Sequence, residues 1–172
     1  MGNISELLLF CPLFKEFTVE ETGRIIADVL YTVSSYTKDQ PVAFEDEECS
    51  RVGIILQGGV DIQKIYPTGK VVTVDTLRPG SVFGEVILFS GMKKYPSSII
   101  SNHDTLILFI SKADILKLCS LDTRFLNNMM GLLSNKILTL NRKIRNLSYQ
   151  TVRQKIAHFI LEEFERKKST AI

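Results

Sequence analysis

The chain has 172 residues, of which 45% are hydrophobic and 23% charged, a balance typical of an ordinary globular protein with one core and an attached element. A formal net charge of +2 is too small to indicate nucleic acid, a membrane or an acidic substrate as the partner. No apolar run is long enough to span a membrane, and we expect no membrane partner. The charges are unevenly spread, because residues 45–48 are all acidic, whereas residues 136–168 contain nine Lys or Arg against three Glu.

The cysteines and histidines argue against a metal site or an enzyme. Cys11, Cys49 and Cys119 show no C-x-x-C spacing, and we expect reduced, buried thiols in a cytoplasmic protein. A metal-dependent cupin needs a cluster of histidines, and this chain has only His103 and His158. The sequence contains no G-x-S-x-G motif and no P-loop, so we expect no catalytic residues and no metal.

The first thirty residues predict short helices. In the motif Thr18-x-x-Glu21, the hydroxyl and the carboxylate each bond the other residue's backbone N–H, which is the capping box of a helix start. An apolar stripe follows at Ile25, Ile26 and Val29.

From residue 31 the pattern changes to short runs rich in β-branched and aromatic residues, separated by turn residues. Many short strands at close spacing predict a sandwich or a barrel. The expected strands are 31–36, 52–57, 60–65, 71–77, 97–101 and 105–110.

Three turns suggest how these strands connect. Gly58-Gly59 stands between two apolar runs and predicts a tight hairpin, because both residues tolerate positive φ. Pro67-Thr68-Gly69 predicts the next hairpin, and Arg78-Pro79-Gly80 predicts the turn after that. These turns together predict an antiparallel meander.

After residue 110 the pattern becomes helical and stays so. Ser111-x-x-Asp114 is a second helix-start signal. From residue 126 apolar residues recur in alternating steps of four and three, the a/d repeat of a coiled coil over three heptads. This seam consists of Leu126, Met130, Leu133, Ile137, Leu140, Ile144 and Leu147.

The seam has two interpretations: one helix lying on its own domain, or two copies pairing as a homodimer. We favour the homodimer, because the stripe is narrow and flanked by polar residues such as Lys136, Asn141 and Arg145. Met129 and Leu132 widen the apolar stripe near its start, which predicts that this end of the helix also contacts the rolled β-structure formed by the preceding strands.

The long helix should stop near Ser148, because Thr151 is a good N-cap and begins a fresh amphipathic segment. Tyr149-Gln150 would then be a hinge. We expect three parts: a β-roll domain with N-terminal helices at 1–120, a dimerisation helix at 121–148, and a hinge with a further helix at 149–172.

The pattern Gly80-x-x-Phe83-Gly84-Glu85, followed by a short helix, a loop and a strand, resembles the cyclic-nucleotide-binding roll of the Crp/Fnr regulators. The opening Cys11-Pro12-Leu13-Phe14 is similar to the start of these regulators, and Arg153-x-x-Ile156-Ala157 to the first helix of their DNA-binding domain. The resemblance covers nearly the whole chain. It implies a mainly β fold with flanking helices: an antiparallel double-stranded β-helix or jelly roll followed by a long coiled-coil dimerisation helix.

The resemblance also implies a ligand site. In members that bind cyclic AMP, a glutamate at the place of Glu85 bonds the ribose, and an arginine at the place of Tyr95 pairs with the phosphate. Tyrosine offers neither the permanent charge nor the bidentate fork of arginine, so we do not expect cyclic AMP as the effector. Two hydroxyl residues that touch adenine in these members correspond here to Leu140 and Asn141.

We therefore expect a homodimeric sensor in the cytoplasm that binds an unidentified small effector in its roll. The effector would bias the long helix, and a winged helix-turn-helix beyond this chain would bind DNA. Two alternatives stay open: a stand-alone cyclic-nucleotide-binding module, and a ligand-free dimerisation adaptor whose roll is filled by side chains. The expected effector contacts are Phe83, Gly84, Glu85, Tyr95, Pro96, Ser97, Ser98, Leu140 and Asn141.

Overall fold

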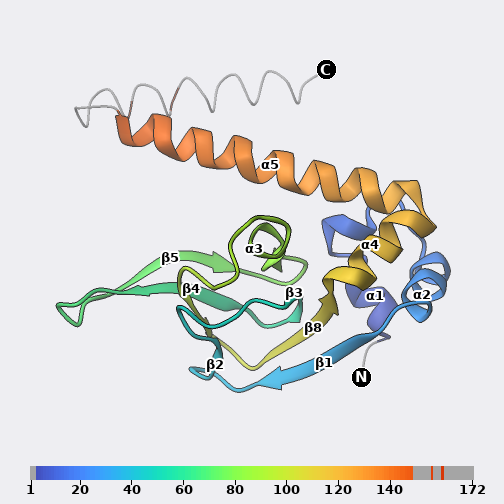
Figure 1. The fold of residues 1–172 in the computed structure, drawn as a ribbon, viewed down its shortest axis with the longest axis horizontal. Coiled ribbons are helices and arrows are strands. Elements are labelled where there is room, and N and C mark those ends of the chain that lie inside the picture. Colours follow the sequence, from blue (N-terminus) through green and yellow to red (C-terminus); the bar gives the residue numbers. More distant parts are fainter. Residues whose placement is uncertain (1–2, 149–155, 157–159, 161–172) are drawn as a thin grey trace. The chain divides into compact units, whose positions relative to one another are not determined.

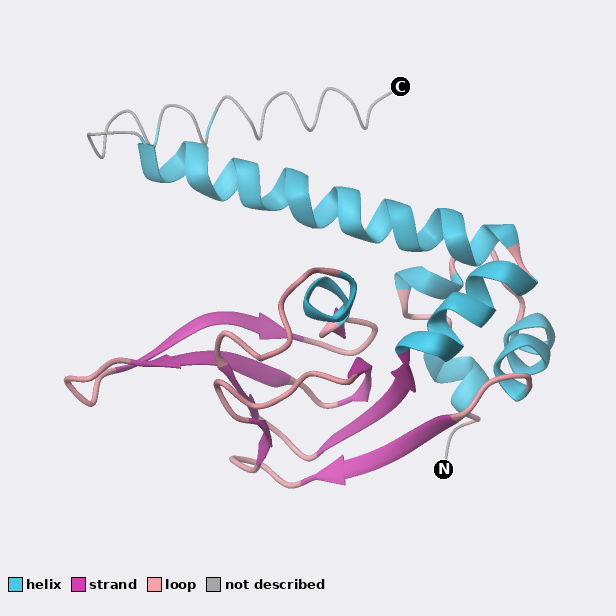
Figure 2. Cartoon of the chain, in the orientation of Figure 1, coloured by secondary structure: helices cyan, strands magenta, loops and turns pink. Residues whose placement is uncertain are grey.

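The computed structural model describes residues 3–148, together with 156 and 160 (Figure 1). The chain divides into two compact units, residues 1–132 and residues 133–172. Helices and strands are distinguished in Figure 2. The helices are α1 (Ile4–Leu8), the 3-10 helix η1 (Pro12–Phe14), α2 (Val19–Ala27), α3 (Glu85–Phe89), α4 (Lys112–Leu121) and α5 (Thr123–Ser148). The strands are β1 (Tyr31–Tyr36), β2 (Pro41–Ala43), β3 (Arg51–Gln57), β4 (Val60–Ile65), β5 (Val71–Leu77), β6 (Val82–Phe83), β7 (Ser98–Ser101) and β8 (Thr105–Ser111).

The strands form two four-stranded antiparallel sheets that enclose one apolar core. The first has the order β1-β8-β3-β6 and the second β2-β7-β4-β5. The chain alternates between the sheets, and among the described strands only β4 and β5 are both consecutive and paired. This is the predicted jelly-roll class of fold. The core inside the roll contains Ala43, Cys49, Ile55, Val60, Phe83, Ile87, Tyr95, Ile99, Ile107 and Phe109.

The predicted meander is wrong, and the reason lies at Gly58-Gly59. β3 and β4 belong to different sheets, so this pair carries the chain across the roll and does not close a hairpin. A Cβ on Gly58, whose φ is 75°, would lie 2.4 Å from the carbonyl oxygen of Asp104, and the Gly59 N–H donates to the hydroxyl of Thr105. Glycine is needed here for close approach of two backbones. The hairpin predicted at Pro67-Thr68-Gly69 is confirmed, because β4 and β5 pair from Val60–Leu77 to Ile65–Val71.

The N-terminal helices begin as predicted. Thr18 accepts from the N–H of Glu21 and its own N–H donates to the Glu21 carboxylate, which completes the capping box. Ser111 caps α4 in a related way by accepting from the N–H of Asp114. In Figure 1, α1, α2 and α4 gather at one end of the roll. Among the described residues, no helix combines the length and apolar character needed to cross a bilayer.

The first turns of α5 are attached to the N-terminal segment by an aromatic contact. Phe125 is completely buried, and its ring meets that of Phe14 edge to face with centroids 5.4 Å apart. Met129, one turn later, is also buried, whereas the side chain of Asn128 donates to the carbonyl oxygens of Leu13 and Lys15. The start of the helix therefore meets the N-terminal helices, where the sequence predicted contact with the roll.

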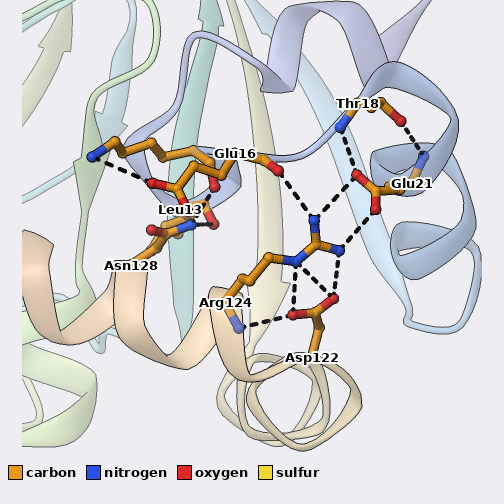
Figure 3. Close-up of polar contacts among 8 residues, drawn as sticks. Leu13, Glu16, Thr18, Glu21, Asp122, Arg124 and Asn128 are labelled. Carbon is orange, nitrogen blue, oxygen red and sulfur yellow. Dashed lines mark hydrogen bonds and ion pairs between the residues drawn. The ribbon is translucent and has the colours of Figure 1, made fainter.

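Arg124 completes this attachment, and Figure 3 shows its guanidinium between two carboxylates. It donates to Asp122 and to Glu21 over 2.8–3.3 Å, and to the carbonyl oxygen of Glu16 at 3.1 Å. The guanidinium also lies 4.2 Å from the ring centre of Phe17. Hydrogen bonds from Arg124 are the main reason that the pKa values of Glu21 and Asp122 lie below their usual ranges.

We expect the Arg124 contacts to make stability depend on pH below about 4.5, the ordinary pKa of glutamate. The unfolded state takes up protons on Glu21 and Asp122 before the folded state does, so this stabilisation is present at neutral pH and is lost as pH falls through the depressed pKa values. Denaturant unfolding of Arg124→Met should show a smaller loss of stability between pH 7 and pH 3 than the wild type. Lys15→Met removes an exposed ion pair with Glu16 and should leave the wild-type loss unchanged. An equal loss in Arg124→Met and wild type would contradict the expectation.

Candidate ligand site in the roll

The candidate site is built on the turn that joins β6 to α3. Phe83 is buried opposite Gly53 of β3, and Gly84 follows with a φ of 82°. A Cβ on Gly84 would lie 2.8 Å from the carbonyl oxygen of Arg51, so both the backbone conformation and the space require glycine here. The turn directs Glu85, the first residue of α3, into the interior, where it is 1% exposed.

Tyr95 lies next to this turn and is buried. Its hydroxyl is hydrogen-bonded to the thiol of Cys49, which is also buried and lies 3.7 Å from the carbonyl oxygens of Gly84 and Arg51. Burial is the main cause that raises the pKa of Tyr95 far above its usual value of 10, with the Cys49 contact as the next cause. A neutral, packed phenol therefore stands where the resemblance would place an arginine.

An acidic loop runs alongside the same segment. The backbone N–H of Cys49 donates to the carbonyl oxygen of Lys93, and that of Tyr95 to the carbonyl oxygen of Glu47. In the opposite direction, the N–H of Asp46 donates to the carbonyl oxygen of Tyr95. Residues 45–48 are all acidic, and the charge of Glu47 contributes to the raised pKa of Tyr95. The backbone pairing thus holds a run of carboxylates along the segment that would face an anionic phosphate.

The cation of Lys64 contacts the segment that follows Tyr95. Lys64 of β4 donates from Nζ to the carbonyl oxygen of Pro96 at 3.0 Å and forms an ion pair with Glu45. The Glu45 N–H in turn donates to the hydroxyl of Ser98, a buried residue at the start of β7. Lys64, Glu45, Pro96 and Ser98 therefore form one polar group at the edge of the core.

The structure brings together most of the expected effector contacts, but not all of them. Phe83 and Tyr95 share the core, Gly84 and Glu85 adjoin them, and Ser98 follows in β7. Pro96 is exposed and Ser97 half-buried. Leu140 and Asn141 lie on α5 in the second unit, whose position relative to the roll is not described.

Lys64, Glu45 and Cys49 were not among the effector contacts expected from the sequence. The sequence contains a pattern that indicates Lys64. Val60 and Ile62 are apolar at alternate positions of one strand, and Lys64 is the next residue on the same face. Within residues 3–148, 156 and 160, no group of three or more His, Cys, Asp or Glu side chains is placed to hold a metal ion.

The predicted seam is a second candidate surface. Its members from Leu126 to Ile144 lie on the continuous helix α5, and five of them are exposed: Leu126 41%, Met130 52%, Ile137 61%, Leu140 57% and Ile144 56%. Leu133 is half-buried. The side chain of Leu147, the hinge at 149–150 and the helix expected from Thr151 lie outside what is described.

Comparison with known proteins relates the chain to one family. The family profile described as the cyclic nucleotide-binding domain matches residues 33–122. The global nitrogen regulator of Synechococcus elongatus is 23% identical over 75% of this chain and 59% of its own length. The cyclic AMP receptor protein of Thermus thermophilus is 22% identical over 88% of this chain and 68% of its own length. The chain thus spans about three fifths to two thirds of these curated relatives.

Solved structures agree on the fold. The catabolite activator protein of Thermus thermophilus matches with a TM-score of 0.69 and 21% identity, over 90% of this chain and 71% of that one. A transcriptional regulator of Thermotoga maritima matches with a TM-score of 0.66 and 21% identity, over 73% of this chain and 96% of that one. At such identities the likeness shows the fold alone.

We expect the Tyr95 phenol to stay protonated at high pH, because burial disfavours the charged form. Absorbance at 295 nm, followed to about pH 11, should show the same tyrosinate signal for Tyr95→Phe as for the wild type. A weaker signal in Tyr95→Phe, by the amount of one tyrosine, would show that the Tyr95 phenol ionises in the folded chain.

Proposed function

Since this chain belongs to the cyclic nucleotide-binding domain family and is a regulator domain of the Crp/Fnr type, we propose that it is the sensor and dimerisation portion of a transcription regulator. The proposal has three parts: a small effector binds in the roll, two copies pair along α5, and the arrangement of the pair controls a DNA-binding domain. The expected division into 1–120, 121–148 and 149–172 is part of this proposal. The relatives reported above are named as regulators or as a receptor, which supports a role without catalysis.

Effector binding in the roll is supported by the group of residues around Gly84, Glu85, Tyr95 and Ser98. Gly84 lies beside the Tyr95 hydroxyl, and Tyr95 belongs to the apolar core inside the roll. Cyclic AMP fits this group poorly, because Tyr95 is neutral and an acidic loop lies beside it. At the position that the resemblance assigns to the phosphate-binding arginine, Tyr95 offers neither a permanent charge nor a bidentate fork. We propose Leu140 and Asn141 as further contacts from α5.

The single observation that carries dimerisation is the division of α5 into two faces. Phe125 packs on Phe14 of the N-terminal segment and Met129 is buried, whereas Leu126 and Met130, one residue further on, are exposed. The apolar a/d row is therefore not used by the contact that attaches the helix. Burying a Leu or Ile side chain stabilises by about 1.5–3 kcal/mol, so a paired row can exceed the cost of association.

Transmission to DNA would run through α5. The effector can act only if it has different affinities for two arrangements of the pair. We propose that the seam at Ile137, Leu140 and Ile144 is the bistable element and that the hinge at 149–150 directs the DNA-binding domain. No disulfide is formed within the part of the chain that the structure describes, and we propose a reducing, cytoplasmic location.

One alternative has direct support in the fold. Tyr95 and Phe83 belong to the packed core inside the roll, which is what a ligand-free dimerisation adaptor would need. A stand-alone cyclic-nucleotide-binding module would instead need a phosphate-binding cation at residue 95. Binding measurements on the whole chain distinguish the three functions.

We expect Leu140→Lys to convert the dimer into monomer. Each dimer loses two buried leucines and gains two lysine charges that face each other. At about 1.5 kcal/mol for each leucine, the dissociation constant of the dimer should rise at least about a hundredfold. Sedimentation velocity across a concentration series measures this directly. Asn135→Lys is the matched control, because it adds the same charge on the opposite face of α5, and it should sediment as the wild type. A wild-type chain that is monomeric throughout the series would refute the dimeric sensor.

We expect no tight binding of cyclic AMP or cyclic GMP. Titration calorimetry with the free chain should give no heat that fits a dissociation constant below about 1 mM, because the Tyr95 phenol supplies no charge for the phosphate. Tight binding would overturn the argument from Tyr95 and favour the stand-alone module.

A further inference from the structure

Lys64 is an ionisable residue at an inner position of the roll. Val60 is buried and Ile62 packs against the core, so the third residue in this alternation, Lys64, points to the same face of β4. The register break between β4 and β5 leaves Val74 of β5 without an opposite residue. The irregularity thus belongs to β5, and the alternation along β4 continues through Lys64.

The position of Lys64 relative to the segment that follows Tyr95 is well defined. Gln63 pairs with Ser98, and Lys64 continues past the end of β7 to reach Pro96 through its Nζ. The lysine therefore places a positive charge beside residues 96–98, in the part of the roll where Tyr95 supplies none.

The partner of this charge is a carboxylate from the chain itself. Glu45 is paired with Lys64, and the side chains are only 30% and 37% exposed. The Glu45 carboxylate accepts a hydrogen bond from Lys64, whereas the Glu45 backbone N–H donates separately to the hydroxyl of Ser98. The carboxylate can therefore leave Lys64 by side-chain rotation without unpairing the loop.

We propose that Lys64 binds the carboxylate group of the effector and that Glu45 is a built-in competitor occupying this position in the unliganded chain. The proposal rests on the proposed function, because it names the chemical class of the effector of that roll. An incoming carboxylate accepts the same charge-assisted hydrogen bond that Glu45 gives up, and the Pro96 carbonyl keeps the ammonium in place. The bound carboxylate replaces Glu45 as the partner of Lys64, so the ammonium remains paired with one carboxylate.

The size of the competition follows from the exposure of the pair. A partly exposed ion pair contributes up to about 1 kcal/mol, which corresponds to about a fivefold change in affinity. Removing the charge of Glu45 should therefore strengthen binding by about fivefold, and removing Lys64 should abolish it.

The test is titration of the full chain with succinate at low ionic strength, followed by calorimetry and by amide NMR shifts. Glu45→Gln should bind succinate about fivefold more tightly than the wild type, and Lys64→Met should show no saturable binding. Glu48→Gln and Lys94→Met are matched controls, because they remove one exposed charge of each sign from the two nearby loops, which an isolated β-bridge joins at these residues. Both should bind within about twofold of the wild type, on the scale of exposed charges.

A gain of affinity in Glu45→Gln cannot arise from misfolding, so the proposal remains testable even if Lys64→Met folds poorly. Equal affinity of wild type, Glu45→Gln and a folded Lys64→Met would overturn it. Inorganic phosphate that competes as strongly as succinate would also overturn the assignment to carboxylates. Sedimentation of the same samples separates the two proposals. If the chain is monomeric and binds succinate through Lys64, only the dimeric sensor is contradicted. If the chain is dimeric and Lys64→Met leaves succinate binding unchanged, only the carboxylate site is contradicted.

Discussion

The rotation of α5 about its own axis is the constraint on which the proposed mechanism depends. Phe125 packs against Phe14, and Arg124 and Asn128 bond the backbone of the segment before α2. Because positions 124, 125, 128 and 129 share one side of the helix, the attachment directs residues 126 and 130 elsewhere. An apolar row that is left unburied in this way provides a surface for a second copy.

The polar and aromatic contacts at this attachment act together. The buried edge-to-face pair supplies apolar area, whereas Arg124 supplies directional bonds to Asp122 and Glu21 and a face-on contact with Phe17. Each ion pair is partly exposed and by itself contributes little to stability. Because all of them share the Arg124 side chain, the entropy cost of ordering that side chain arises only once. The result is a defined starting direction for the helix.

Inside the roll, Tyr95 decides the chemistry of the proposed site. It is buried, and it stands where the resemblance implies an arginine, so it fills apolar space and supplies none of the charge that a phosphate requires. Lys64 approaches the same segment from β4, where an apolar residue would continue the alternation. The charge available to a ligand is therefore displaced to the neighbouring strand, and it is already matched by the carboxylate of Glu45.

Local patterns in the sequence were sufficient for much of the fold. The capping box at Thr18, the Pro67-Thr68-Gly69 hairpin and the continuous helix through the a/d row depend on residues within a few positions of one another, and the structure confirms them. The resemblance to a known roll supplied the fold class and the turn at Gly84. The short strands β2 and β6 escaped prediction, because two or three residues carry no measurable periodicity.

Only the tertiary structure could decide which strands pair and which charges meet. Gly58-Gly59 satisfies the local requirements of a hairpin, yet the pairing depends on Asp104 and Thr105, more than forty positions away. The bond of Lys64 to Pro96 and its pairing with Glu45 likewise join residues from three separate stretches of chain. Periodicity and turn chemistry act over short ranges of sequence and determine elements. The partner of a buried or half-buried polar group depends on packing between elements, which a single sequence does not encode in any local pattern.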